Sequence, residues 1–164
     1  MDLFEEYLKK ENSSIWVKRA LTDRSYKKEY QKDNKENYVG QTNKDLATYG
    51  DAIIKLCILD LKLDKTENLT IDKSFIESDE NLVRVIAKHY NMLEYIYTDI
   101  EDEKIKRDYD FIKPDKTSGK NRKKSPHKYI ATSVEAMIGA IYKEEGKLDN
   151  IIELIDSWCK LSRD

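Results

Sequence analysis

The stretch that decides the fold is Leu46-Ala-Thr-Tyr-Gly-Asp-Ala-Ile-Ile-Lys55, and it has a counterpart in Tyr129-Ile-Ala-Thr-Ser-Val-Glu-Ala-Met-Ile-Gly-Ala-Ile-Tyr142. Both stretches have helical periodicity, and each carries one acidic residue, Asp51 or Glu135, within an apolar run. An unpaired charge is costly to bury, so a buried carboxylate needs a cation beside it. The two stretches therefore predict two central helices that carry functional acids.

Helical spacing extends around both stretches. The first helix is expected over about 45–63, with a core stripe formed by Leu46, Tyr49, Ile53, Leu56 and Leu63. The second is expected to start at Ser125-Pro126 and to run to about Glu145, with a core stripe formed by Ile130, Val134, Met137, Ile138 and Ile141. Small residues line both helices, Gly50 and Ala52 on one and Gly139 on the other. They permit a close crossing that would bring the two carboxylates together.

The rest of the chain also favours helices. Apolar residues with helical spacing begin at Leu3, at Ile15 and at Leu148, and Ser78 is a candidate N-cap for a helix with Leu82 on its core face. Residues 27–43 are polar and are expected to form a long loop. We therefore predict an all-α fold.

Composition supports one helical domain spanning residues 1–164. Charged residues make up 38% of the chain and apolar residues 39%, with only five glycines and two prolines. Cys57 and Cys159 each fall in a helical apolar pattern, so buried thiols are expected rather than a disulfide. The N-terminus has no signal-peptide pattern and no apolar run approaches about 18 residues, which predicts a soluble, cytoplasmic protein.

The charge distribution is uneven although the net charge is only −2. A loop at about 115–128 contains no acid between residues 116 and 128, and its basic residues are Lys116, Lys120, Arg122, Lys123, Lys124 and Lys128. We call these six residues the basic arm. It is a candidate contact for nucleic acid, and a merely solvated loop is the alternative.

Three segments in order carry a family resemblance. The segment 20–26 (Ala-Leu-Thr-Asp-Arg-Ser-Tyr), the segment 46–51 and the segment 130–139 resemble the motifs of the ribonuclease III catalytic domain, and the likeness spans about residues 15–160. Mini-ribonuclease III, a short branch without a double-stranded-RNA-binding domain, is similar at segments 46–52 and 132–136. It also has a basic loop like Gly119-Lys-Asn-Arg-Lys-Lys124.

This chain departs from the common family pattern at several positions. The positions of Lys44, Ala47 and Thr132 are usually acidic in ribonuclease III, whereas the mini-ribonuclease III branch resembles this chain at Ala47 and Thr132. Lys55 stands where that branch tends to have an acid, while segment 20–26 is closer to the full-length enzymes. The placement within the family therefore stays open.

The resemblance implies a metal-dependent endoribonuclease that acts on double-stranded or structured RNA, with ribosomal RNA precursors as one candidate substrate. Asp51 and Glu135 would be catalytic and would bind Mg²⁺, or Mn²⁺ in its place, and the ion would activate water. Thr132 is a candidate to hold a metal-bound water, with helix packing as the alternative, and Glu67 is a weaker candidate ligand. The basic arm would follow RNA phosphates.

The resemblance also implies a homodimer. Tyr49 and Trp16 are candidates for its interface, although we favour burial of both in the core. Two alternatives to an active enzyme remain. One is a degenerate ribonuclease III fold that serves as an RNA-binding or ribosome-associated dimerisation module, and the other makes Asp51 and Glu135 ordinary salt-bridge partners.

Overall fold

The computed structural model describes residues 1–26, 42–100 and 128–163, and within them the all-α prediction is confirmed. The helices are α1 (Leu3–Leu8), α2 (Ile15–Ala20), α4 (Lys44–Lys62), α5 (Leu69–Ile76), α6 (Asp79–Asn81), the π-helix η1 (Leu82–Ala87), the 3₁₀ helix η2 (Met92–Glu94), α8 (Lys128–Glu145) and α9 (Asp149–Leu161). One isolated bridge joins Thr22 to Tyr97. The described part of the chain contains no helix long and apolar enough to span a bilayer.

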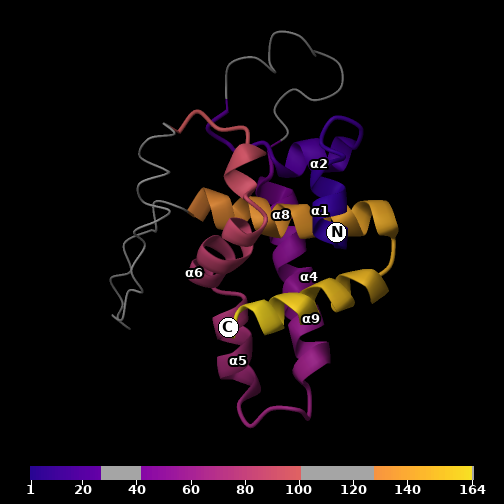
Figure 1. Cartoon of the computed structure of the whole chain (residues 1–164), viewed down its shortest axis with the longest axis vertical. Coiled ribbons are helices and arrows are strands. Elements are labelled where there is room, and N and C mark those ends of the chain that lie inside the picture. Colours follow the sequence, from indigo (N-terminus) through magenta and orange to yellow (C-terminus); the bar gives the residue numbers. More distant parts are fainter. Residues whose placement is uncertain (27–41, 101–127, 164) are drawn as a thin grey trace.

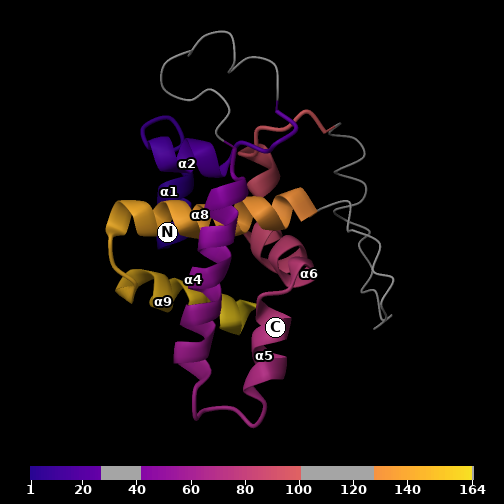
Figure 2. The same ribbon diagram turned by 180° about the vertical axis from the view of Figure 1, so that it is seen from behind.

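The fold is organised around the crossing of α4 and α8, which make the most extensive helix contact in the described part (Figures 1 and 2). The helices touch through two glycines. A Cβ added at Gly50 would lie 1.7 Å from the backbone oxygen of Glu135, and one added at Gly139 would lie 2.6 Å from the backbone oxygen of Leu46. The close crossing predicted from the small residues is therefore confirmed.

The two central helices differ in how completely they are covered. The predicted stripe of α8 is confirmed, because Ile130, Val134, Met137, Ile138 and Ile141 are all buried. The predicted stripe of α4 is only partly right. Leu46 and Ile53 are buried, as are Ile54, Cys57 and Ile58, but Tyr49, Leu56 and Leu63 are exposed. The described elements that pack on α4 include α2, α5, α8 and α9, and they leave this face of α4 open.

An aromatic cluster joins the two ends of the chain. Phe4 packs against Tyr90 and Trp158, with ring centroids 4.5 and 5.4 Å away, and the Trp158 indole nitrogen donates to the Tyr90 hydroxyl at 3.0 Å. Cys57 and Cys159 are buried free thiols, which confirms their predicted role.

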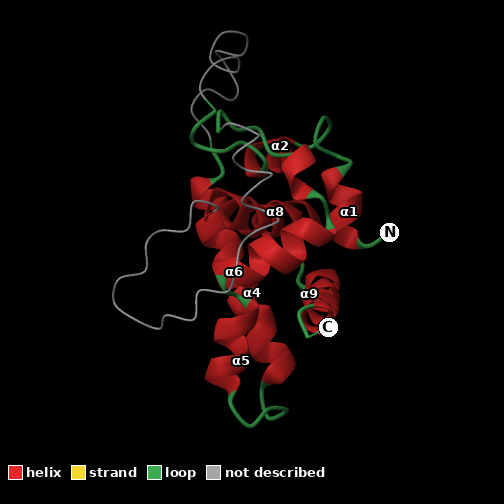
Figure 3. Cartoon of the chain, turned by 60° about the vertical axis from the view of Figure 1, so that its left-hand side comes forward, coloured by secondary structure: helices red, strands yellow, loops and turns green. Residues whose placement is uncertain are grey.

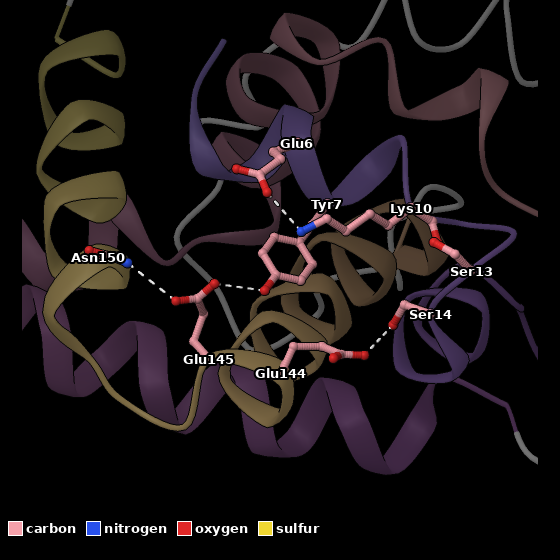
Figure 4. A network of polar contacts seen from close by, with 8 residues as sticks. All are labelled: Glu6, Tyr7, Lys10, Ser13, Ser14, Glu144, Glu145 and Asn150. Atoms are coloured by element: carbon pink, nitrogen blue, oxygen red, sulfur yellow. Dashed lines mark hydrogen bonds and ion pairs between the residues drawn. The ribbon is translucent and has the colours of Figure 1, made fainter.

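A polar network fixes the C-terminal end of α8 to the first two helices (Figure 4). The Tyr7 hydroxyl donates to Glu145 at 2.7 Å, and the same glutamate accepts from Asn150 at 3.2 Å. The Ser14 hydroxyl donates to Glu144 and also accepts from the Val17 amide, so it caps α2. Burial raises the pKa of Tyr7, and the hydrogen bond to Glu145 raises it further. The network thus fixes the C-terminal end of α8, the helix that carries Glu135 nearer to its N-terminus.

The segment after α4 contains one helix that the sequence analysis did not predict. Asn68 caps α5 by accepting from the Ile71 amide at 3.0 Å, and α5 runs back alongside α4 to form a hairpin that extends from the rest of the bundle (Figure 3). Ser78 caps α6 as predicted, by accepting from the Asn81 amide at 3.2 Å. Most of the predicted loop 27–43 and most of the basic arm lie outside the described residues.

Gly50→Ala should strongly destabilise the fold. A methyl group 1.7 Å from a backbone oxygen cannot be accommodated by moving a flexible side chain, so α4 and α8 must separate. We expect a loss of at least about 3 kcal/mol in the free energy of unfolding, measured by chemical denaturation. Thr48→Ala, on the exposed side of the same helix, is the control and should change stability little. Equal stability of both variants would contradict the close crossing.

Candidate active site

The glycine crossing places Asp51 and Glu135 at one site. Asp51 follows Gly50 directly on α4, and the backbone oxygen of Glu135 is the atom that lies against Gly50. Both side chains are partly buried, and their charges interact strongly enough for Asp51 to raise the pKa of Glu135. The predicted convergence of the two acids is therefore what the structure shows.

Glu135 is the most perturbed acid among the described residues. Its pKa rises from 4.5 to about 8, first because burial removes water from the carboxylate and then because Asp51 and Asp79 repel its negative charge. Lys128 and Lys55 act in the opposite direction. Within the described part of the chain, no donor or cation contacts the Glu135 carboxylate within hydrogen-bond or ion-pair distance. This carboxylate therefore lacks the positive charge that its ionised form requires.

Asp51, by contrast, already has a cation. The Lys55 ammonium lies 2.6 Å from Asp51 Oδ2, one helical turn farther along α4. This hydrogen bond is the main reason why the pKa of Lys55 is raised, and the charges of Asp51, Glu77 and Glu135 add to it against the effect of burial. The sequence analysis noted Lys55 only as a departure from the family pattern.

Two further acids near the site were missed as site residues. Asp79 lies in the first turn of α6, where a negative charge favours the helix N-terminus, and it is also close enough to Glu135 to raise the pKa of that residue. Glu77 pairs with Lys73 at 2.9 Å through one oxygen, and its other oxygen is buried without a hydrogen-bond partner in the described part of the chain. No helical spacing links residues 77 and 79 to Glu135, because their approach to it depends on the turn between α5 and α6.

The other positions that the sequence analysis considered for the site lie at varying distances from Asp51 and Glu135, on α4, on α8 or in the turn after α4. Ala47 is buried one turn before Asp51, and Lys44 is exposed at the start of α4. The Thr132 hydroxyl donates to the Lys128 backbone oxygen at 2.9 Å, which is a bond within α8. Glu67 is exposed in the turn between α4 and α5, about three helical turns along α4 from Asp51.

Lys128 is the one member of the basic arm that the structure describes. It is exposed in the first turn of α8, two turns before Glu135, and its charge lowers the pKa of that residue. Lys116, Lys120, Arg122, Lys123 and Lys124 lie outside the described residues.

The donor set suits a hard divalent cation. No cluster of three or more His, Cys, Asp or Glu side chains arranged for a metal occurs among residues 1–26, 42–100 and 128–163. However, Mg²⁺ commonly binds through one or two carboxylates and keeps several waters. Asp51 and Glu135 supply two such carboxylates, and the unsatisfied charge of Glu135 would be compensated by the ion.

The chain matches the family model described as the ribonuclease III domain over residues 44–146. This match includes both central helices and covers more than half of the chain. The chain belongs to the ribonuclease III domain family. The family resemblance inferred from segments 46–51 and 130–139 is therefore confirmed.

Two solved structures of the nuclease domain of ribonuclease III from Campylobacter jejuni are similar to this ribonuclease III domain. One has a TM-score of 0.59 at 20% sequence identity, with 97% of this chain and 90% of the other covered. The second has a TM-score of 0.58 at 21% identity, with 97% and 92% covered, and its title refers to a region involved in dimer formation. These likenesses confirm the fold. A search of curated proteins finds no significant match.

The raised pKa of Glu135 predicts a pH-dependent stability of the metal-free protein. The folded state holds this proton more tightly than the unfolded state, so stability should fall as the pH rises from about 4.5 to about 8. Glu135→Gln removes this titration, and at pH 8.5 it should be more stable than the wild type by roughly 1 kcal/mol, after allowance for solvent screening.

The measurement is chemical denaturation in the presence of a chelator at several pH values. Glu153→Gln, at an exposed position on α9, is the matched control and should parallel the wild type. Parallel curves for wild type and Glu135→Gln would show that the Glu135 carboxylate is fully solvated, which would contradict the description of the site.

Proposed function

We propose that this ribonuclease III domain is a divalent-metal-dependent endoribonuclease that cleaves double-stranded or structured RNA. One observation carries the proposal: the Gly50–Gly139 crossing brings together Asp51 and Glu135, and no cation among residues 1–26, 42–100 and 128–163 pairs with Glu135. A partly buried acid without a partner destabilises the fold when ionised, and such groups cluster at functional sites. Family membership supports the reaction class.

Asp51 and Glu135 would hold Mg²⁺ or Mn²⁺. When bound, the ion supplies a Lewis acid that polarises the scissile phosphate and activates water. Glu135 must lose its proton to bind the ion, so ion binding should release protons near neutral pH. Thr132 remains a candidate to orient a water, through the lone pairs of a hydroxyl whose proton is already donated to Lys128.

The proposed reaction is hydrolysis of a phosphodiester. One water gives up a proton as its oxygen forms a bond to phosphorus, the bond from phosphorus to the 3′ oxygen breaks, and the 3′ oxygen takes up a proton. The products are a 5′-phosphate and a 3′-hydroxyl.

The substrate proposal rests on charge. Lys128 lies on the same helix as Glu135, and the basic arm leads into this helix. We propose that an RNA strand bound at Lys128 extends along α8 to the two acids. Lysine contacts to phosphate make binding fall steeply with salt, and A-form RNA is recognised largely by shape. Ribosomal RNA precursors, in the cytoplasm, are the structured substrates we propose.

We further propose that the domain forms a homodimer through the α4–α5 hairpin. The exposed face of α4 and the adjacent α5 carry five large apolar side chains that are 41–63% exposed: Tyr49, Leu56, Leu63, Ile71 and Phe75. Tyr49 was expected in the core, and its exposure overturns that expectation. Trp16 is partly buried, with Arg19 and Lys143 over its ring. Exposed apolar side chains in this number on one helical hairpin fit a second copy, and a solved relative is described as having a region involved in dimer formation.

The second candidate function is a noncatalytic RNA-binding or dimerisation module. It is favoured by the ion pair between Lys55 and Asp51, which neutralises one of the two acids, and by the apolar Ala47 one turn away. Both candidates share the RNA-binding and dimer proposals and differ only in cleavage.

Asp51→Asn and Glu135→Gln should each abolish cleavage. A long double-stranded RNA would be incubated at low salt with Mg²⁺, with Mn²⁺ or with chelator, and the products resolved on a gel. We expect metal-dependent cleavage by the wild type and a loss of at least about 100-fold in each variant, because each removes a charge that holds the ion. RNA binding without cleavage under every metal would favour the noncatalytic module.

Phe75→Lys together with Leu63→Glu should convert the dimer into a monomer, because charges would be buried in an apolar interface. The measurement is the molar mass in solution by light scattering. Ile15→Lys is the matched control, since Ile15 is also about half exposed but lies on α2. A monomeric wild type would contradict the homodimer proposal.

A further inference from the structure

Lys55 is surrounded by carboxylates from three parts of the fold. Its ammonium lies 2.6 Å from Asp51 on α4, and it also interacts with the charges of Glu135 on α8 and Glu77 at the end of α5. Asp79 adds a further negative charge beside Glu135. The nearby cations are Lys128, which is exposed at the start of α8, and Lys73, which is paired with Glu77. Among the described residues, Lys55 is thus the cation held at the acidic site.

An ordinary surface ion pair does not account for this arrangement. The same geometry occurs on α9, where Lys160 lies 2.6 Å from Asp156, four residues earlier. The Lys160 side chain is 75% exposed and the Lys55 side chain is 40% exposed, but Lys10 in its pair with Glu6 is also 40% exposed, so exposure does not distinguish Lys55. What distinguishes Lys55 is that its charge interacts with acids from outside its own helix, Glu77 and Glu135. An isolated pair of this kind contributes little to stability. Lys55 is placed where its charge can act on whatever binds at Asp51 and Glu135.

We propose that Lys55 is a catalytic residue that supplies a fixed positive charge to the scissile phosphate, beside a single divalent ion held by Asp51 and Glu135. This inference rests on the proposed function. Cleavage of a phosphodiester builds negative charge on the phosphate oxygens, and a donor fixed in a partly dehydrated site stabilises that charge. The Lys55 ammonium donates to one of these oxygens and keeps its proton throughout, so it takes no part in proton transfer.

According to this proposal, removal of the Lys55 charge increases the affinity for the metal ion but decreases the rate of cleavage. Removal of the Lys55 charge lowers the electrostatic repulsion on the incoming ion and frees an oxygen of Asp51, so the ion binds more tightly. The same change removes a charge that stabilises the transition state, so cleavage slows. If Lys55 only formed a salt bridge with Asp51, its removal would leave the cleavage rate at saturating metal unchanged, and if it only oriented Asp51, its removal would weaken metal binding.

The test compares Lys55→Met, Lys55→Arg, Lys160→Met and the wild-type protein. Mn²⁺ binding is followed by titration calorimetry and by the electron paramagnetic resonance of the free ion. Cleavage of a short RNA duplex is followed in single turnovers at saturating Mn²⁺. For Lys55→Met we expect about tenfold tighter Mn²⁺ binding and at least about 100-fold slower cleavage. Lys55→Arg should recover part of the cleavage rate, and Lys160→Met should equal the wild type in both measurements.

The outcomes separate this inference from the proposed function. A wild type that cleaves, together with a Lys55→Met variant that cleaves equally fast or binds Mn²⁺ more weakly, would overturn the role of Lys55 alone. If the wild type binds Mn²⁺ at this site but does not cleave RNA, the proposed nuclease function is wrong. The proposed catalytic role of Lys55 is then wrong as well, because there is no reacting phosphate for it to contact. A wild type that binds no Mn²⁺ would overturn the metal site on which both depend.

Discussion

The close contact of α4 and α8 at Gly50 and Gly139 is the constraint on which the rest of the structure depends. Because no Cβ fits at Gly50, the backbone oxygen of Glu135 can lie directly against α4. The two acids therefore meet without any loop to position them. The surrounding helices serve this contact, since the Tyr7–Glu145 hydrogen bond and the buried stripe of α8 fix where that helix crosses. A rigid helix crossing is a suitable support for a site whose ligands must be held closely.

The electrostatics of the site follow from the same contact. Burial and neighbouring acids raise the pKa of Glu135 to about 8, and Lys55 compensates Asp51 but does not contact Glu135. The metal-free site is therefore unbalanced: one acid is paired and the other holds a proton. A divalent ion would replace that proton. The two candidate functions, nuclease and noncatalytic module, differ in whether this exchange takes place.

The sequence predicted the features that depend on residue type and spacing along one helix. Residue type and spacing were enough to predict four features: the buried stripe of α8, the Ser78 cap, the helix crossing and the proximity of Asp51 to Glu135. Features that depend on how separate helices pack against one another could not be predicted from the sequence. Tyr49 and Leu56 have the spacing of a core face, but the described elements leave both exposed, even though the Tyr49 ring packs against Tyr142 of α8. Asp79 approaches Glu135 through a turn between α5 and α6, which no periodicity encodes.

The central claim is that the crossing forms one metal site from Asp51 and Glu135. The most direct measurement is anomalous X-ray diffraction from crystals of the wild-type protein grown with Mn²⁺ near pH 8, where Glu135 can lose its proton. The account predicts one strong anomalous peak per chain, within coordination distance of an oxygen of Asp51 and an oxygen of Glu135. A well-ordered site with no peak between these two carboxylates, or with Lys55 still bound to Asp51 and Mn²⁺ located elsewhere, would contradict it.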